Sequence, residues 1–159
     1  MRIEAFLRES PLFAVTTVAR RFEALTANIL ADDKLSFFEA LILAAIFFEA
    51  PRPVRPSSLA DTFATTRGNI SHCVSSLEAR DLLQRRIDPN DARAYCLTLK
   101  PQGRKAALRV IGAFDKLQRI FERETGKSAL REMLTSLRNV EAAYTSATAR
   151  NRAAHSPSA

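Results

Sequence analysis

The sequence has few of the residues that mark several classes of protein. It contains two cysteines, four glycines and no tryptophan in 159 residues. Cys73 and Cys96 are too few for a disulfide framework, and neither has a partner at metal-ligand spacing. Scarce glycine and long runs of Ala, Leu, Arg and Glu favour a mainly helical chain. We therefore expect a helical protein in a reducing, cytoplasmic setting.

Long apolar runs are also missing. The longest, Ala40 to Phe48, is shorter than the roughly 20 residues that cross a bilayer. Charged residues interrupt the first nine positions, so the apolar centre of a signal peptide is missing. No carboxylate pair, Ser/His/Asp set, metal cluster or glycine-rich phosphate loop is recognisable. We expect no membrane partner, no cofactor and no enzymatic activity.

Positive charge dominates the later part of the chain. The net charge is +7 and the pI is near 10.1. Residues 1–51 carry five basic and seven acidic side chains, so the excess of positive charge lies in residues 52–159. Basic side chains gain from binding polyanions through counterion release. Charge alone does not choose between nucleic acid and a membrane surface.

Apolar residues at three- and four-residue steps predict helices at both ends of the chain. The first runs from Pro11 to about Leu30. The second, 37–48, follows a capping box of Ser36 and Glu39 and is apolar on nearly every side, which is typical of a central core helix.

The same period returns later in the chain, from Gln102 to about Glu124 and from Lys127 to about Tyr144. Gly126 lies between these two runs and is a helix stop. The two runs therefore predict two C-terminal helices.

The middle of the chain predicts two short helices and a hairpin. Three prolines at 51–56 indicate an extended connection, after which Ser57 or Ser58 caps a helix at 59–63. A turn at 64–65 precedes a new helix capped by Thr66. Residues 82–87 and 94–99 then flank a cluster of turn formers, which predicts a β-hairpin with a long polar tip. The fold expected is mainly α with a small β-hairpin wing, a winged helix-turn-helix with additional helices at both ends.

The helix after Thr66 has two contrasting faces. One face is apolar and must be buried; it consists of Ile70, Cys73, Val74 and Leu77. The other face has small or polar side chains, namely Gly68, Ser71, His72 and Ser75. Small residues around a longer donor let a helix approach base edges in the major groove. Arg67, Asn69 and His72 are the candidates for base contacts, and Thr66 and Ser71 for phosphate contacts. The alternative is an ordinary helix cap with a solvated face.

The hairpin supplies the second candidate surface. Arg85, Arg86 and Arg93 bracket its tip, and an arginine there can enter the minor groove. We expect Asp91 to hydrogen-bond Arg93 and orient it, because an unpaired acid would repel phosphate. The alternative is a charged tip that only keeps the hairpin soluble.

With these residues in view, the chain resembles the MarR (multiple-antibiotic-resistance regulator) family of bacterial repressors. The resemblance covers about 35–103 and is most specific in the wing, Asp-Pro-x-Asp-x-Arg at 88–93 followed by Leu-Thr and then glycine. It implies that Arg67, Asn69, Ser71 and His72 face the major groove and that Arg93 is the wing arginine. It also implies an obligate dimer formed by the first and last helices.

The chain departs from the family pattern at two positions. Asp81 stands where glycine is usual, so an aspartate must adopt a left-handed or strained conformation, which Asp tolerates better than most residues. Ala92 replaces a common arginine and removes one wing charge.

The domains expected are an N-terminal dimerisation helix at 1–34, a winged helix-turn-helix at 35–100, C-terminal dimerisation helices at 101–146 and a disordered tail at 147–159. The function expected is a homodimeric, sequence-specific regulator of double-stranded DNA, a repressor on a pseudo-palindromic operator. A small apolar or aromatic effector would release it. The DNA-binding residues expected are Ser57, Ser58, Thr66, Arg67, Gly68, Asn69, Ser71, His72, Ser75, Arg85, Arg86, Asp91 and Arg93.

Two other functions stay open. Residues 52–93 carry seven basic and five acidic side chains, so a winged-helix protein-interaction module without DNA binding is one alternative. A redox-sensing regulator that uses Cys73 or Cys96 is the other. Six phenylalanines could line an effector pocket, although plain core packing is their commoner role: Phe13, Phe22, Phe37, Phe38, Phe47 and Phe114.

Overall fold

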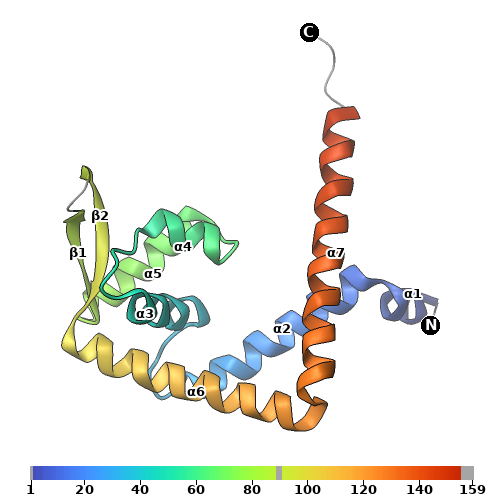
Figure 1. Ribbon diagram of the computed structural model, residues 1–159, viewed down its shortest axis with the longest axis horizontal. Helices are drawn as coiled ribbons and strands as arrows, with labels where there is room; N and C mark the ends of the chain where they lie inside the picture. Colours follow the sequence, from blue (N-terminus) through green and yellow to red (C-terminus); the bar gives the residue numbers. More distant parts are fainter. Residues whose placement is uncertain (1, 89–90, 155–159) are drawn as a thin grey trace. The chain divides into compact units, whose positions relative to one another are not determined.

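The computed structural model describes residues 2–88 and 91–154 and confirms the mainly α fold with a two-stranded antiparallel wing (Figure 1). The chain forms two compact units, one of residues 17–115 and one of residues 1–16 with 116–159. The elements are, in order, α1 (Arg2–Glu9), α2 (Pro11–Ile29), α3 (Phe37–Glu49), α4 (Pro56–Thr62), α5 (Arg67–Ala79), β1 (Leu83–Asp88), β2 (Asp91–Leu99), α6 (Pro101–Thr125) and α7 (Lys127–Ala154).

The core of the 17–115 unit is built around α3. Its capping box is present, with the Ser36 amide donating to Glu39 Oε2 at 2.7 Å and the Glu39 amide donating to Ser36 Oγ at 3.3 Å. Ile42 and Leu43 of α3 are fully buried. Each such side chain contributes about 1.5–3 kcal/mol through burial. The core includes residues from α5, both strands and α6, among them Ile70, Val74, Leu77, Leu83, Leu97 and Val110.

The phenylalanines divide between core and surface. Phe38, Phe47 and Phe114 are partly buried and pack against the core, whereas Phe13 and Phe22 are exposed. The first three therefore contribute to core packing, the role that the sequence favoured, and Phe47 also lines a cavity with Leu97 and Arg104.

Helix α4 corrects one prediction. It begins at Pro56, with Arg55 as its N-cap, so Ser57 and Ser58 lie inside its first turn and do not cap it. The reason is that proline's fixed φ suits the first helical position, which moves the start of the helix upstream. The Thr66 cap of α5 is confirmed, because its hydroxyl accepts from the Asn69 amide at 3.1 Å.

The hairpin has a shorter tip than the sequence predicted. β2 begins at Asp91, which pairs with Asp88 after a register shift at Ile87. That irregularity lets the strands continue through polar residues that otherwise indicate a turn. Residues 89 and 90 lie outside the described part of the chain. At the other end, Val54 bridges to Leu97, whose amide donates to the Val54 carbonyl at 2.8 Å.

The turn at Asp81 and Leu82 joins three elements. Asp81 has φ 58°, which confirms the left-handed conformation predicted for it. Its carboxylate pairs with Lys100, and the Lys100 amide donates to the Leu82 carbonyl at 3.0 Å. Gly103 lies against the same carbonyl. The end of α5, the start of β1 and the first turn of α6 therefore meet at one point.

The terminal helices extend beyond the predicted limits. Gly126, at φ 78°, separates α6 from α7 as expected. α7 runs to Ala154, so the tail predicted to be disordered from 147 is helical that far; alanines and arginines favour helix, and no glycine or proline intervenes before Pro157. α1 was not predicted. Over residues 2–88 and 91–154, no helix has the length and apolarity of a membrane span.

Two glycines of α6 give opposite predictions for stability. A Cβ on Gly103 would lie 1.7 Å from the Leu82 carbonyl oxygen, so the backbone would have to move. We expect Gly103→Ala to destabilise the fold by about 2–3 kcal/mol or more. A Cβ on Gly112 meets no described atom within 4 Å, and Gly112→Ala should stabilise by about 0.5–1 kcal/mol. Denaturant unfolding measures both, and equal effects would contradict the close approach at Leu82.

Candidate nucleic-acid interface

Helix α5 presents a small, polar face to solvent. Ile70, Cys73, Val74 and Leu77 are buried, as predicted. The opposite side is exposed over its length and consists of Arg67, Gly68, Ser71, His72 and Ser75. This face has two longer donor side chains, Arg67 and His72, among residues short enough for the helix backbone to approach a partner surface.

Asn69 does not belong to this exposed face. It is half-buried, and its side-chain Nδ2 donates to Thr65 Oγ1 at 3.0 Å. Its Oδ1 lies 4.0 Å from the Cys73 sulfur. The amide therefore stabilises the turn between α4 and α5, and a base contact by Asn69 would require it to leave these partners.

The two cysteines are buried in the winged-helix unit. Burial raises the pKa of the Cys73 thiol, and the negative charge of Glu39 raises it further. Since the thiolate is the reactive form, Cys73 is held in its unreactive state. Cys96 is shielded from solvent in β2.

Arg85 lies at the base of the wing and connects it to α5. Its Nη2 donates to Ser75 Oγ at 3.0 Å, its backbone amide donates to Glu78 Oε1 at 3.1 Å, and its guanidinium pairs with the Glu78 carboxylate. The same guanidinium lies 5.8 Å from the Tyr95 ring centre. Arg85 was predicted to bracket the tip, but its contacts hold the hairpin beside α5.

A second ion pair anchors the outer part of the wing. Arg55 Nε, at the start of α4, donates to Asp88 Oδ2 at 2.7 Å. Asp88 is 2% exposed, whereas the Arg55 side chain is 41% exposed. The bond to Asp88 raises the pKa of Arg55, so the guanidinium stays charged. The sequence analysis missed this pair because its members lie 33 positions apart in the chain and no local pattern links them.

The remaining predicted residues lie in α4 and in the hairpin. Ser57 and Ser58 are exposed in α4, and Arg86 is exposed on β1. Asp91 is half-buried at the start of β2. The backbone of Arg93 belongs to β2, but its side chain lies outside what the structure describes, so the hydrogen bond between Asp91 and Arg93 stays a prediction.

The interface contains no described metal centre. Within residues 2–88 and 91–154, no group of three or more His, Cys, Asp and Glu side chains could hold a metal ion. The arrangement is instead a small polar helix face with a β-hairpin fixed beside it.

Comparisons with known proteins agree with this geometry. No protein-family model matches the sequence, and neither does any curated protein. Solved structures with the same fold are MarR-family transcriptional regulators. The S. aureus MepR–DNA complex is 13% identical, covers 85% of this chain and 96% of its own, and has a TM-score of 0.77.

Two further structures extend the comparison. Bordetella bronchiseptica BpsR, described with the regulation of its DNA binding by 6-hydroxynicotinic acid, is 17% identical over 84% of this chain and 94% of its own, with a TM-score of 0.71. A probable transcriptional regulator from Pseudomonas aeruginosa is 26% identical over 82% of this chain and 98% of its own, with a TM-score of 0.67. These neighbours are transcriptional regulators and not enzymes.

Substitutions at the two members of the Arg55–Asp88 pair should lower the stability of the fold by unequal amounts. Arg55→Leu removes the counter-charge of a buried carboxylate, and we expect it to destabilise the fold, by less than for a fully buried pair because Arg55 is half-exposed. Asp88→Asn should cost less, since the exposed Arg55 can be hydrated. The double variant Arg55→Leu, Asp88→Asn should recover part of the loss. Thermal unfolding measures all three, and strictly additive effects would show that the pair does not anchor the wing.

Proposed function

We propose that this chain, whose structure is that of the MarR-family regulators, is a sequence-specific regulator that binds double-stranded DNA as a homodimer. The observation that carries the proposal is the exposed polar face of α5 with the hairpin fixed beside it. Arg85 holds the base of the hairpin to α5, and Arg55 holds Asp88 near its tip. A helix and a wing fixed in this way can engage neighbouring grooves of one duplex.

In this proposal α5 is the recognition helix and lies in the major groove. Arg67 and His72 are the donors that read base edges, and arginine pairs best with the two acceptors of guanine. Gly68, Ser71 and Ser75 let the helix approach closely. Thr66, Ser57 and Ser58 are exposed, and their hydroxyls can donate to phosphates and so fix the register of the protein on the duplex.

The wing reaches the adjacent minor groove through Arg86 and Arg93 in this proposal. Narrow minor grooves concentrate negative potential and attract arginine. We assign Arg85 to positioning the wing, because its guanidinium is engaged by Ser75 and Glu78. The acid at Asp88 does not oppose binding, since Arg55 neutralises it.

The unit of residues 1–16 and 116–159 supplies the dimer surface. It exposes an apolar groove between the start of α2 and helix α7, lined by Leu12, Val15, Leu134, Leu137, Val140 and Tyr144. Leu12 is 53% and Tyr144 is 59% exposed. Apolar surface of this kind marks an interaction site, and a second copy of the chain covers it symmetrically. The two recognition helices would then read the two halves of a palindrome.

Repression, and release by a small ligand, complete the proposal. Two recognition helices must lie about 34–36 Å apart, or a multiple of that, to meet successive major grooves. A ligand that changes their spacing by a few ångströms would weaken binding. The regulation of BpsR by a small aromatic acid supports this part of the proposal by analogy of fold.

Two variants test the DNA-binding surface, and their effects on affinity and on sequence preference should differ. Arg93→Ala should weaken binding to all sequences, because one positive charge that displaces counterions from the DNA is lost. The slope of log affinity against log salt should fall in magnitude by about 1. His72→Ala should cost about 1–3 kcal/mol at particular base pairs and leave other sequences unaffected. Binding is measured on DNA upstream of the chain's own coding region over a salt series.

Arg20→Ala, an exposed arginine of α2, serves as the control and should leave binding unchanged. If the wild-type chain binds with a salt slope near zero and no preference for a palindrome, the interaction-module alternative holds instead. If neither His72→Ala nor Arg93→Ala alters binding, the reading surface is elsewhere.

A further inference from the structure

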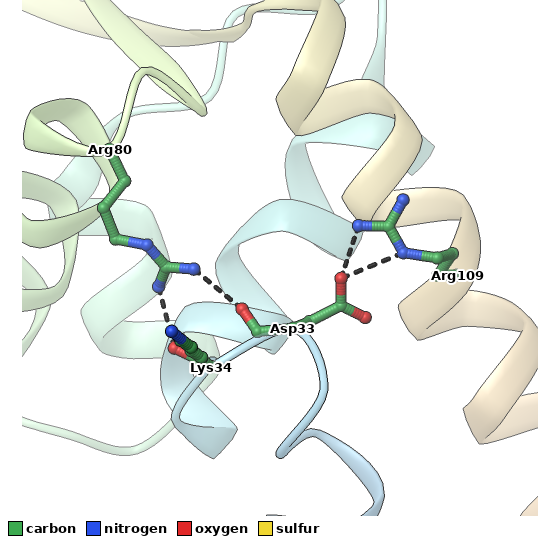
Figure 2. A network of polar contacts seen from close by, with 4 residues as sticks. All are labelled: Asp33, Lys34, Arg80 and Arg109. Carbon is green, nitrogen blue, oxygen red and sulfur yellow. Dashed lines mark hydrogen bonds and ion pairs between the residues drawn. The ribbon is translucent and has the colours of Figure 1, made fainter.

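Asp33 connects the recognition helix to α6 through contacts that the DNA-binding proposal does not use (Figure 2). Its carboxylate Oδ1 accepts from Arg109 Nε at 2.9 Å, and Arg109 Nη2 pairs with the same oxygen. The backbone carbonyls of Asp33 and Lys34 accept from Arg80 Nη2 at 2.7 Å and Arg80 Nη1 at 2.8 Å. We call these four residues the Asp33 junction.

The junction joins α5, α6 and the turn that follows α2. Arg80 is the C-cap of α5, Arg109 belongs to α6, and Asp33 lies in the turn that follows α2. All four residues belong to the 17–115 unit. α2 and α6 are also the helices that continue along the chain into the other unit. The end of the recognition helix is thus bonded to the turn that follows α2, and the same turn is bonded to α6.

The geometry requires arginine at position 80. Lys34 has φ 51°, a left-handed conformation, and its carbonyl and that of Asp33 are both bonded to one guanidinium. The planar fork of arginine matches two acceptors at once, whereas the ammonium group of lysine is a compact charge without this geometry. A role limited to attracting phosphate would be filled equally well by lysine.

We propose that the Asp33 junction is a positioning device that sets the orientation of α5 relative to α2 and α6. The inference rests on the proposed function, since its consequence is the presentation of α5 to DNA. Asp33 is the shared member: its carboxylate bonds to α6 and its carbonyl bonds to α5. A displacement of α2 or α6 is therefore transmitted to the C-terminal end of the recognition helix.

Four variants of the full chain test the junction by DNA affinity. Arg80→Lys keeps the charge and loses the fork, while Asp33→Asn removes the negative charge that pairs with α6 and Arg109→Gln removes the guanidinium on α6. We expect each to lower affinity about three- to tenfold without changing the salt slope, because no phosphate contact is lost. The double variant, Asp33→Asn with Arg109→Gln, should bind DNA no more weakly than the single variant with the lower affinity. The reason is that both substitutions disrupt the same ion pair. Lys105→Gln is the control: it removes an exposed charge from α6, the helix of Arg109, and it should bind DNA like the wild type.

Hydrogen exchange gives a readout that does not depend on DNA. The amides of Arg80, Asp81 and Leu82 close the end of α5 through bonds to Ser76, Glu78 and Leu77. These amides should exchange faster in Arg80→Lys and Asp33→Asn, while the Leu97 amide in the hairpin should not change. Unchanged exchange at residues 80–82 in these variants, or wild-type DNA affinity in Arg80→Lys, would overturn the positioning role proposed for the junction. If the wild-type chain does not bind DNA, the proposed function fails and exchange alone decides on the junction.

Discussion

The close approach of α6 to the Leu82 carbonyl is the constraint on which the rest of the winged-helix unit depends. Gly103 permits it, because any side chain there would occupy the position of that carbonyl. Leu82 follows α5 by three residues and immediately precedes β1. Fixing this one peptide against α6 therefore fixes where the recognition helix ends and where the wing begins. The left-handed Asp81 supplies the change of direction that the turn needs.

Several longer polar side chains of the unit hold this geometry through ion pairs and hydrogen bonds. Arg85 and Glu78 close the base of the wing, Arg55 and Asp88 hold its outer part, and Arg80 attaches the far end of α5 to the Asp33 turn. The small residues of α5 are left as the exposed surface. A rigid arrangement of helix and hairpin costs less conformational entropy on binding than a mobile one, which is the physical basis of a preorganised interface.

Local patterns in the sequence predicted the features that depend on neighbouring residues. The capping box at Ser36, the two faces of α5 and the Thr66 cap follow from spacings of three or four residues. The conformation of Asp81 followed instead from the resemblance to the MarR family, in which glycine is usual at that position. The Arg55–Asp88 pair and the Asp33 junction could not be predicted, since their members lie 33 to 76 residues apart. The start of α4 was misplaced because two serines resemble caps, whereas Pro56 determined the first turn.

A footprint tests the central claim, that a dimer reads duplex DNA through two copies of α5 and its wing. Hydroxyl-radical cleavage of the bound upstream DNA should show two equivalent protected segments whose centres are about 10–10.5 base pairs apart, or a multiple of that. Methylation of guanine N7 in the major groove should be blocked at the centre of each segment. A single protected segment, or protection with the major-groove N7 positions still fully reactive, would contradict the account.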